Sequence, residues 1–528
     1  MPARVSARPP LGGDPQLQPD ASRFLEDAAH YPGGHAGGVI CPRSIEDVSA
    51  ALQRGGHILP VGAQSSLTGG ATPFGDIVLS TEGLDAIARE GDRVRVGAGV
   101  PLQALQDELL KAGRWFPPVP TYLGAFAGGA IATCAAGAAT FKYGTVRRWV
   151  EELTIVLAGG DVLTLRRGEC IADHDGVFEI VTSSGIRRIQ IPDIQMPDVP
   201  KCSAGYFVAA RMDLIDLFIG SEGTLGIIAA AVLKTAPMPS GMCRAFVPVP
   251  SEDAAIALVT ALRLASVETW GSRDPVGIDL AAIEHLDARS IEVIREDGVD
   301  RKLDITLPSG AAVVLLIDLE LPAAAGGDDL WAQLEAVRDP GGADTPLRRF
   351  CGVLDRAGVL DDTEIALPGD RARAAAFAEL REAVPSGVNR RVAQAKQIDP
   401  AISKTAADMI VPFARFHEMM RACRRLCAER GLDLAVWGHI SDGNVHPNVI
   451  PHGLEDVEKG RDAILELGRI VIGMGGSPLA EHGVGRNPMK QELLRRLYGD
   501  AGVAAMRRIK LSLDPHGSLA NGVIFPSQ

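Results

Sequence analysis

Three histidines and one glutamate lie in two short glycine-containing segments of the second half of the chain. Residues 437–446 read WGHISDGNVH, and residues 480–486 read AEHGVGR. Imidazole nitrogen and carboxylate oxygen are ligands that divalent transition metals accept, and histidine also exchanges protons near neutral pH. The two segments therefore indicate a metal site with an acid–base group beside it.

The order of residues in the first segment predicts a β-hairpin. Asp442-Gly443 is a strong signal for a two-residue turn, which would place His439 directly opposite His446. Directly opposed residues of an antiparallel pair have Cβ atoms about 4.5–5.5 Å apart, close enough for two imidazoles to bind one cation. Because side chains alternate between faces, one polar face would hold His439, Ser441, Asn444, His446 and Asn448.

A metal held by two imidazoles usually takes a carboxylate as well, and Glu481 is the candidate. The set of His439, His446 and Glu481 suits Zn, Mn, Fe or Co. His482 follows directly in the sequence, and an imidazole with a pKa of about 6.5 can act as a general base. The alternative interpretation is a pair of hydrogen-bonded core histidines beside an ordinary turn.

The composition is that of a globular protein with more than one domain. The chain has 528 residues, of which 46% are hydrophobic and 23% charged, so two or three domains with buried cores are expected. The net charge of −13 argues against a nucleic-acid-binding surface. Apolar runs of about 18 residues are missing, so we expect no transmembrane segment.

The cysteines and the N-terminal residues are typical of a cytoplasmic protein. Eight cysteines show no C-x-x-C spacing, which favours reduced thiols. Residues 1–19 are rich in proline and glycine and lack the apolar region of a signal peptide, so a flexible leader is expected. The expected location is the cytoplasm, with the periphery of a membrane as a variant.

The first part of the chain alternates short β-type runs with helical stretches. Strands are expected at 57–61, 76–80, 93–97, 154–158 and 161–165, and helices at 44–54 and 101–112. Two loops rich in small residues, at 60–70 and 117–137, have backbone amides that could line a pyrophosphate or a ring. The second could equally be a buried helix of small residues. It lacks the G-x-G-x-x-G fingerprint of nicotinamide-binding folds.

A composition shift divides the chain near Pro237-Met238-Pro239, shortly after the glycine cluster GSEGTLG at 220–226. Beyond this boundary the patterns predict a capped helix that begins after Ser251 and a buried strand at 311–320. Further helices are expected at 412–431, 453–473 and 501–513.

The ordered set of GSEGTLG, HISDGNVH and EHGVG resembles the FAD-linked oxidoreductases of the vanillyl-alcohol oxidase/PCMH superfamily. Within it, the chain is similar to the D-2-hydroxyacid dehydrogenases, which include D-lactate, D-2-hydroxyglutarate and glycolate dehydrogenases. The resemblance covers residues 42–525 and implies an α+β fold. A PCMH-type FAD-binding domain would span 20–238, and a substrate or cap domain with an antiparallel sheet flanked by helices would span 239–512. The C-terminal tail, 513–528, would return to the FAD domain.

The resemblance also implies a set of FAD contacts. The loop at 62–70 would hold the pyrophosphate, later loops would line the flavin, and the glycine cluster at 220–226 would lie near the adenine. The matching positions are Gly62, Ala63, Gln64, Ser65, Ser66, Gly69, Pro120, Thr121, Gly128, Gly129, Gly137, Tyr143, Gly144, Glu222, Gly223, Ile228 and Asn521. Residues 63–64 and the ending LANGV at 519–523 depart from the usual family pattern. Because no histidine occupies an attachment position in these loops, the FAD would be bound non-covalently.

For the reaction, the resemblance implies metal-assisted oxidation of a D-2-hydroxy acid to the 2-oxo acid. The metal would bind the substrate hydroxyl, His482 would take its proton, and hydride would pass to flavin N5. The expected substrate-binding residues are Arg381, Lys404 and Asn448, with Lys396 and Arg486 as competing partners of the substrate carboxylate. Arg381 and Lys404 could equally be ordinary surface residues.

Electrons would pass to a quinone, a cytochrome, an electron-transfer flavoprotein or another non-nicotinamide acceptor, and the chain could form a homodimer. One alternative is a same-fold enzyme with other chemistry, such as an alkyl-dihydroxyacetone-phosphate synthase or a phenol oxidase. Another is a non-catalytic flavin-binding subunit. The histidine pair and the Glu-His motif favour the hydroxyacid dehydrogenase over both.

Overall fold

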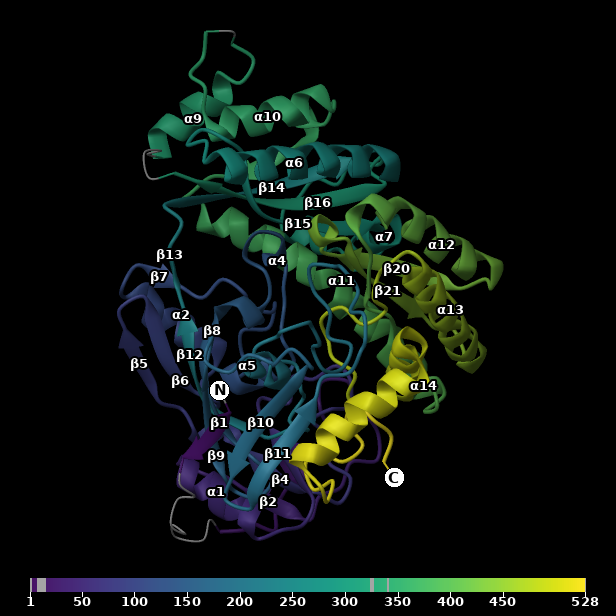
Figure 1. The fold of residues 1–528 in the computed structure, drawn as a ribbon. Coiled ribbons are helices and arrows are strands. Elements are labelled where there is room, and N and C mark those ends of the chain that lie inside the picture. Colours follow the sequence, from purple (N-terminus) through teal and green to yellow (C-terminus); the bar gives the residue numbers. More distant parts are fainter. Residues whose placement is uncertain (1, 7–15, 323–326, 340, 528) are drawn as a thin grey trace. The chain divides into compact units, whose positions relative to one another are not determined.

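The computed structural model describes residues 2–6, 16–322, 327–339 and 341–527. Its chain divides into two compact units (Figure 1), and each is described by itself. Unit 1 comprises Met1–Gly137, Gly144–Met238 and Ser477–Gln528, and unit 2 comprises Ala138–Tyr143 and Pro239–Gly476.

A small parallel sheet and one helix lie near the start of unit 1. The strands, in spatial order, are β2 (Gly38–Ile40), β4 (Ile77–Ser80) and β3 (Ile58–Val61), and the helix is α1 (Ile45–Gln53). Helix α1 begins at a capping box: Ser44 Oγ accepts from the Asp47 N–H, and the Asp47 carboxylate accepts from the Ser44 N–H. The predicted helix at 44–54 and strands at 57–61 and 76–80 are therefore confirmed.

An eight-stranded sheet forms the larger part of unit 1. Its spatial order is β11-β10-β1-β9-β8-β12-β6-β5. The strands are β1 (Ala3–Ser6), β5 (Ile87–Glu90), β6 (Arg93–Gly97), β8 (Val150–Val156), β9 (Val162–Arg166), β10 (Val177–Thr182), β11 (Gly185–Gln190) and β12 (Ile227–Lys234). One hydrophobic cluster joins this sheet, through Val156 and Ile227, to the small sheet and α1, through Leu79 and Val48.

Strand β1 corrects the expectation of a flexible leader over residues 1–19. Ala3–Ser6 pair antiparallel with β9 and parallel with β10. This pairing satisfies the backbone groups of a segment that is too polar to be recognised as a strand from its sequence. Residues 7–15 of the expected leader lie outside the described residues.

The remaining elements of unit 1 connect or flank these sheets. They are η1 (Ser22–Phe24), η2 (Thr81–Gly83), α2 (Leu102–Leu110), β7 (Arg114–Trp115), α3 (Ala127–Ala132), η3 (Val146–Trp149), α5 (Leu214–Phe218), β13 (Ala236–Pro237) and α14 (Pro488–Leu513). After α14 the tail returns to the small sheet, as expected. The Ile58 N–H donates to Ser518 O and the Ala520 N–H to Ile58 O, both at 2.8 Å.

Unit 2 is built on an antiparallel sheet, which confirms the architecture expected for the second domain. Its spatial order is β17-β14-β16-β15-β20-β21-β18, with β19 also paired to β21. The strands are β14 (Gly241–Val249), β15 (Asp279–Asp287), β16 (Val313–Leu321), β17 (Glu364–Ala366), β18 (Thr405–Ala406), β19 (Met409–Ile410), β20 (Asp433–Gly438) and β21 (Asn444–Ile450).

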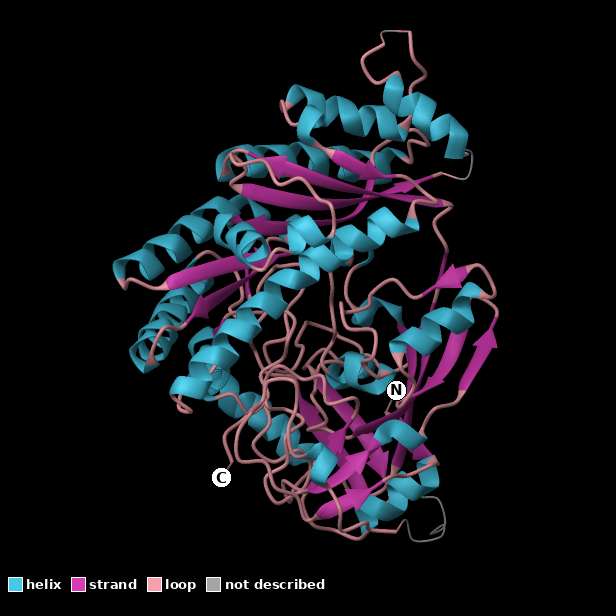
Figure 2. Cartoon of the chain, turned by 180° about the vertical axis from the view of Figure 1, so that it is seen from behind, coloured by secondary structure: helices cyan, strands magenta, loops and turns pink. Residues whose placement is uncertain are grey.

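Helices cover both faces of this sheet (Figure 2). They are α4 (Thr140–Tyr143), α6 (Glu252–Ser272), α7 (Ala288–Glu296), α8 (Val299–Lys302), α9 (Gly327–Glu335), α10 (Pro346–Arg356), α11 (Arg371–Ile398), α12 (Phe416–Glu429) and α13 (Leu454–Gly473), with 3-10 turns η4 (Leu360–Asp362), η5 (Phe413–Arg415) and η6 (Ile440–Asp442). The core under α7 and α11 includes Ile291 and Leu380, and Phe377 stacks on Phe246 of β14 with ring centroids 5.6 Å apart.

Helix α6 is long and apolar enough to meet the criterion for a membrane span, with a mean hydropathy of 1.2 over 18 residues. In unit 2, α6 buries Leu258, Val259 and Leu262, each at most 3% exposed. A helix that packs one face on a sheet meets the same criterion. The finding is therefore weak evidence for a membrane segment.

Two segments belong to a different unit from the one that the expected domain boundaries assign to them. Residues 138–143 belong to unit 2, where Lys142 Nζ donates to Asp279 Oδ2 at 2.7 Å and to Glu320 Oε2 at 2.6 Å. Residues 477–512, expected in the substrate domain, belong to unit 1. Glu481 and His482 thus share a unit with the proposed FAD loops.

Candidate active site

The hairpin that carries the two histidines exists, but its register differs from the prediction. His446 pairs with Trp437 of β20, and His439 begins a longer connection that contains η6. Gly443 ends this turn at a φ of 81°, and a Cβ there would lie 2.3 Å from Val411 O. Although His439 is not opposite His446, the two imidazoles converge, with ring centroids 5.5 Å apart and planes at 86°.

Two other residues of the expected polar face hold this connection in place. Ser441 Oγ accepts from the Ile283 N–H of β15 at 3.2 Å. Asn444 Nδ2 donates to Asp408 Oδ1 at 3.0 Å and to Met409 O at 2.9 Å. Both residues are fully buried and these contacts fix the loop, while Asn444 Oδ1 accepts no hydrogen bond from the described residues.

His439 is bound to a buried carboxylate that the sequence analysis did not identify. Its Nδ1 forms a hydrogen bond with Glu284 Oε1, and Glu284 Oε2 accepts from Arg381 Nε at 2.9 Å. His439 is 2% exposed and Glu284 8%. Burial alone would raise the pKa of Glu284, but His439 and Arg381 outweigh it and hold that pKa well below its usual range.

His446 has a carboxylate of its own. Its Nδ1 lies 3.5 Å from Asp408 Oδ1, and Asn444 orients Asp408 from the other side. Nearby, Asn448 Nδ2 donates to His446 O at 2.9 Å, and Asn448 Oδ1 accepts no hydrogen bond from the described residues although the side chain is 2% exposed. Buried carbonyl oxygens normally accept a hydrogen bond, so Asn448 Oδ1 is a candidate acceptor for a polar ligand.

In unit 1, the other proposed ligand forms a buried ion pair. Glu481 Oε2 lies 2.7 Å from Lys201 Nζ, with 7% and 1% of the two side chains exposed. His482 Nε2 lies 3.4 Å from Glu481 Oε1, and its side chain is 26% exposed. His482 is therefore the more solvent-accessible of the two neighbours, as proton exchange requires.

Three further contacts within unit 1 anchor the loop that carries Glu481 and His482. Ser203 Oγ accepts from the Gly483 N–H at 2.9 Å. Glu222 accepts from the Val484 N–H at 2.8 Å and from the Gly485 N–H at 2.9 Å, and burial raises its pKa to about 7 despite these two bonds. Glu222, expected near the adenine, thus has both oxygens engaged by the EHGVG loop.

The donor sets fit a divalent metal. His439 and His446 are buried side by side; His439 Nδ1 is hydrogen-bonded to Glu284, and His446 Nδ1 lies 3.5 Å from Asp408 Oδ1. Two imidazoles with a carboxylate are ligands that Zn, Mn, Fe and Co accept.

The loop after β3 fits a pyrophosphate. The N–H groups of Ala63, Gln64, Ser65 and Ser66 donate to none of the described residues. Gln64 has a φ of 53° in the middle of this run, and alternation of right- and left-handed backbone turns successive amides toward one anion. Gly69, with a φ of 73°, cannot carry a side chain because its Cβ would lie 2.7 Å from the Tyr31 ring.

The second predicted flavin loop is mostly irregular, and its only helix among the described residues is the six-residue α3. The structure therefore favours the loop over the long buried helix considered as the alternative. A Cβ on Gly128 would lie 2.6 Å from Ala98 Cβ, and one on Gly137 would lie 2.3 Å from Val119 O, so chain packing requires both glycines. A Cβ added at Gly129 would have no neighbouring atom within 4 Å, so packing does not require this glycine. Pro120 and Thr121 are accessible to solvent.

The other positions expected around the FAD lie in varied surroundings. Tyr143 is in unit 2, where its hydroxyl donates to Glu320 Oε1 at 2.6 Å. Gly144 and Gly223 have φ values of 72°, and Ile228 is buried in β12. Asn521 presents its backbone oxygen to Arg486.

The four basic residues considered as partners of the substrate carboxylate differ in their burial and in the acceptors that they already contact. Arg486 is buried against Asp76 Oδ2 at 3.0 Å. Lys404 is exposed and donates to Asn389 Oδ1 at 2.9 Å, and Lys396 is exposed on α11. Arg381 donates through Nε to Glu284 and through Nη1 to Glu382, and no described residue accepts from its Nη2.

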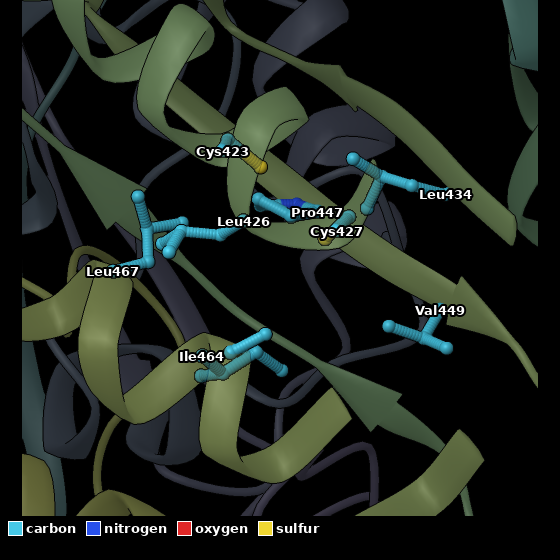
Figure 3. A pocket seen from close by; sticks show the side chains of 9 residues that line it. Cys423, Leu426, Cys427, Leu434, Pro447, Val449, Ile464 and Leu467 are labelled. Atoms are coloured by element: carbon cyan, nitrogen blue, oxygen red, sulfur yellow. The ribbon is translucent and has the colours of Figure 1, made fainter. Parts of the chain in front are cut away.

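A small apolar pocket in unit 2 is separate from this chemistry (Figure 3). Helices α12 and α13 and strands β20 and β21 enclose it, and the lining residues are Cys423, Leu426, Cys427, Leu434, Pro447, Val449, Ala463, Ile464 and Leu467. None of the predicted site residues lines it.

Comparison with known proteins identifies the family. Residues 239–524, more than half of the chain, match the profile described as FAD linked oxidases, C-terminal domain, and residues 36–166 match an FAD binding domain. The chain belongs to the FAD-linked oxidases. The FAD site expected from the glycine-rich loops thus has the support of the family.

This FAD-linked oxidase has relatives of similar length. It is 28% identical to the D-lactate dehydrogenase of Archaeoglobus fulgidus over 497 residues, which cover 92% of the chain and 90% of the relative. It is 27% identical to the glycolate oxidase subunit GlcD of Bacillus subtilis, with coverages of 92% and 88%. It is 26% identical to the D-2-hydroxyglutarate dehydrogenase of Xanthomonas citri pv. viticola, with coverages of 92% and 89%.

The fold of this FAD-linked oxidase is also that of a solved alkyldihydroxyacetonephosphate synthase. The TM-score is 0.59 at 14% identity, covering 96% of the chain and 82% of the synthase. At this identity the likeness shows the fold alone.

Proposed function

We propose that this FAD-linked oxidase oxidises a D-2-hydroxy acid to the 2-oxo acid with the help of a divalent metal. The observation that carries the proposal is the pair of buried imidazoles, one hydrogen-bonded to Glu284 and the other 3.5 Å from Asp408. Histidines that ligate metals almost always give their second nitrogen to such a partner. The names of the relatives support a 2-hydroxy acid, because lactate, glycolate and 2-hydroxyglutarate share the α-hydroxycarboxylate group.

The proposed ligands are His439, His446 and Glu481, and the proposed cofactor is non-covalent FAD on the loop after β3. When bound, FAD supplies the hydride acceptor and the metal supplies positive charge for the developing alkoxide. Both histidines are buried, and a charge interacts more strongly in a protein interior than in water.

His482 is proposed as the general base. Its ring nitrogen Nε2 is held near Glu481 Oε1, and a quarter of its side chain remains exposed. A carboxylate neighbour stabilises the imidazolium that forms when His482 accepts the hydroxyl proton. The exposed edge then lets His482 return the proton to solvent.

Arg381 is proposed to bind the substrate carboxylate through Nη2, the one guanidinium nitrogen without an acceptor among the described residues. Asn448 Oδ1 would accept from a substrate hydroxyl, because the amide nitrogen already donates to His446 O. Lys404 remains a candidate only for the outer part of a longer substrate, since its side chain is exposed.

The remaining proposals concern partners and location. We propose a quinone, a cytochrome or an electron-transfer flavoprotein as acceptor, and a cytoplasmic or membrane-peripheral location. The exposed apolar residues Leu264 and Val267 of α6, 65% and 54% exposed, are compatible with a peripheral contact.

The test is anaerobic reduction of the bound flavin by a panel of D- and L-2-hydroxy acids, followed by absorbance near 450 nm. We expect D-acids alone to bleach the flavin, and His446→Ala to slow bleaching by at least about 100-fold, because a lost metal ligand costs more than the 10–100-fold of an outer partner. His452→Ala, an exposed histidine with 74% of its side chain in solvent, is the matched control. Unchanged bleaching in His446→Ala or with excess chelator would exclude the metal role.

A further inference from the structure

Glu284 links a proposed metal ligand to a guanidinium. Its Oε1 accepts from His439 Nδ1, and its Oε2 accepts from Arg381 Nε at 2.9 Å. The side chains of His439, Glu284 and Arg381 are 2%, 11% and 12% exposed. Both carboxylate oxygens are therefore engaged by different donors, which holds the carboxylate in one orientation.

The hydrogen bond to Glu284 decides which ring nitrogen of His439 carries the hydrogen. A neutral imidazole carries one N–H, and a carboxylate that accepts from Nδ1 keeps the hydrogen there. The lone pair is then on Nε2, and ring rotation would break the bond to Glu284. A neighbouring negative charge also makes Nε2 a better electron donor to a cation.

We propose that Glu284 is a positioning residue for the metal: it holds His439 as the Nδ1–H tautomer and leaves Nε2 for the ion, while Arg381 holds Glu284. The inference rests on the metal role proposed above. Glu284 acts through His439 and touches neither the metal nor the substrate.

A purely structural role for Glu284 is the competing explanation. A buried carboxylate beside Arg381 could serve only to neutralise the guanidinium in the core of unit 2. The two roles differ in one measurable quantity: a structural partner affects stability, whereas a positioning partner affects metal affinity in a protein that remains folded and loaded with flavin.

The first experiment measures metal affinity of the flavin-loaded Glu284→Gln protein by competition with a chromophoric chelator, using Zn²⁺ as the probe. Glutamine puts an NH2 donor in place of one carboxylate oxygen, so either His439 Nδ1–H or Arg381 Nε–H loses its acceptor. We expect Zn²⁺ to bind about 10–100-fold more weakly, with flavin content unchanged and turnover restored at saturating metal. The matched control is Glu382→Gln, which removes the other carboxylate on Arg381, 47% exposed, and should keep wild-type affinity.

Two further variants keep the test decisive if Glu284→Gln alone does not fold. The double variant Glu284→Gln/Arg381→Met removes both charges and leaves no unpaired ion, and we expect it to show the same loss of affinity. Arg381→Met alone retains the carboxylate on His439 and should bind Zn²⁺ within about threefold of wild type, a smaller change than an outer-partner loss. Equal affinity in the double variant and wild type would overturn the inference.

The outcome also separates this inference from the proposed function. Wild-type protein that binds no Zn²⁺ would refute the metal role itself. Wild-type protein that binds Zn²⁺ as tightly as the Glu284 variants would refute only the positioning role.

Discussion

Lys201 places an ammonium group 2.7 Å from Glu481 Oε2, and the two side chains are 1% and 7% exposed. A buried ion pair adds little stability compared with apolar residues, but either charge alone is costly in a protein interior. In unit 1 the ammonium group of Lys201 therefore compensates the charge of the buried Glu481 carboxylate. Arg381 does the same for Glu284 beside His439 in unit 2.

Replacing Lys201 should show the cost of an unpaired buried carboxylate. We expect Lys201→Met to lower the free energy of unfolding by about 3–5 kcal/mol, measured by urea denaturation at neutral pH. Lys111→Met provides the control, because its partner Glu108 lies at the surface and 67% of the Lys111 side chain is exposed. A Lys201 variant as stable as the control would show that the pair is not required to bury Glu481.

His285 makes a second prediction at the scale of a single residue, because it is buried in β15 and neither ring nitrogen forms a hydrogen bond with a described residue. Burial, with a contribution from Arg424, lowers its pKa from 6.5 to about 3. The unfolded chain therefore binds a proton between these values and the folded chain does not, so the contribution to stability is complete above pH 6.5 and falls toward pH 3.

The measurement is the pH dependence of unfolding for wild type and for His285→Phe. The difference between them should change by at most about 1.4 kcal/mol per pH unit below pH 6.5 and should be constant above it. A difference independent of pH would mean that His285 is protonated in the folded state.

The connection between β20 and β21 decides the histidine geometry at the scale of elements. Gly443 has a φ of 81°, and its Cβ would lie 2.3 Å from Val411 O, a backbone atom that cannot move alone. Gly431, at the end of α12, has a φ of 65° but nothing within 4 Å of an added Cβ. The two glycines share a backbone conformation and differ in the space around them.

Comparison of Gly443→Ala with Gly431→Ala should isolate the role of this turn. Both variants carry the strain of a left-handed residue, about 1–3 kcal/mol. Only Gly443→Ala should also weaken metal binding, because the clash displaces the connection that begins at His439. Metal titration of both variants checks this, and equal affinities would show that His439 does not depend on the turn.

The C-terminal tail contributes to unit 1 at the scale of the whole molecule. Leu519, Val523, Ile524 and Phe525 are at most 4% exposed, and the Ala520 N–H donates to Ile58 O at the start of β3, the strand that precedes the proposed pyrophosphate loop. Lys510 Nζ, near the end of α14, donates to Asp514 Oδ2 at 3.0 Å and to Leu519 O at 2.7 Å. These hydrogen bonds hold the start of the tail against the helix. Residues from both ends of the chain therefore build one unit.

Deleting residues 513–528 should release FAD, because six buried apolar residues, including Leu513 and Ala520, are removed from the unit that carries the pyrophosphate loop. The ratio of absorbance at the flavin maximum to that of the protein, after gel filtration, measures the loss. A deletion of residues 526–528, where Pro526 and Ser527 are exposed, should retain the flavin. Full retention in the longer deletion would remove the tail from the cofactor site.

Local patterns of the sequence determined which residues could do chemistry and which elements carry them. The helix at 44–54, the turn near Asp442-Gly443 and the amide-lined loop at 60–70 depend on a few neighbouring residues, so they were predictable. The tertiary structure decided the partners of these groups. Glu284 lies 155 positions from His439, and Lys201 lies 280 positions from Glu481. The register of β21 and the pairing of β1 also depend on packing between distant segments, because hydrogen bonds and buried charges are satisfied in space and not along the chain.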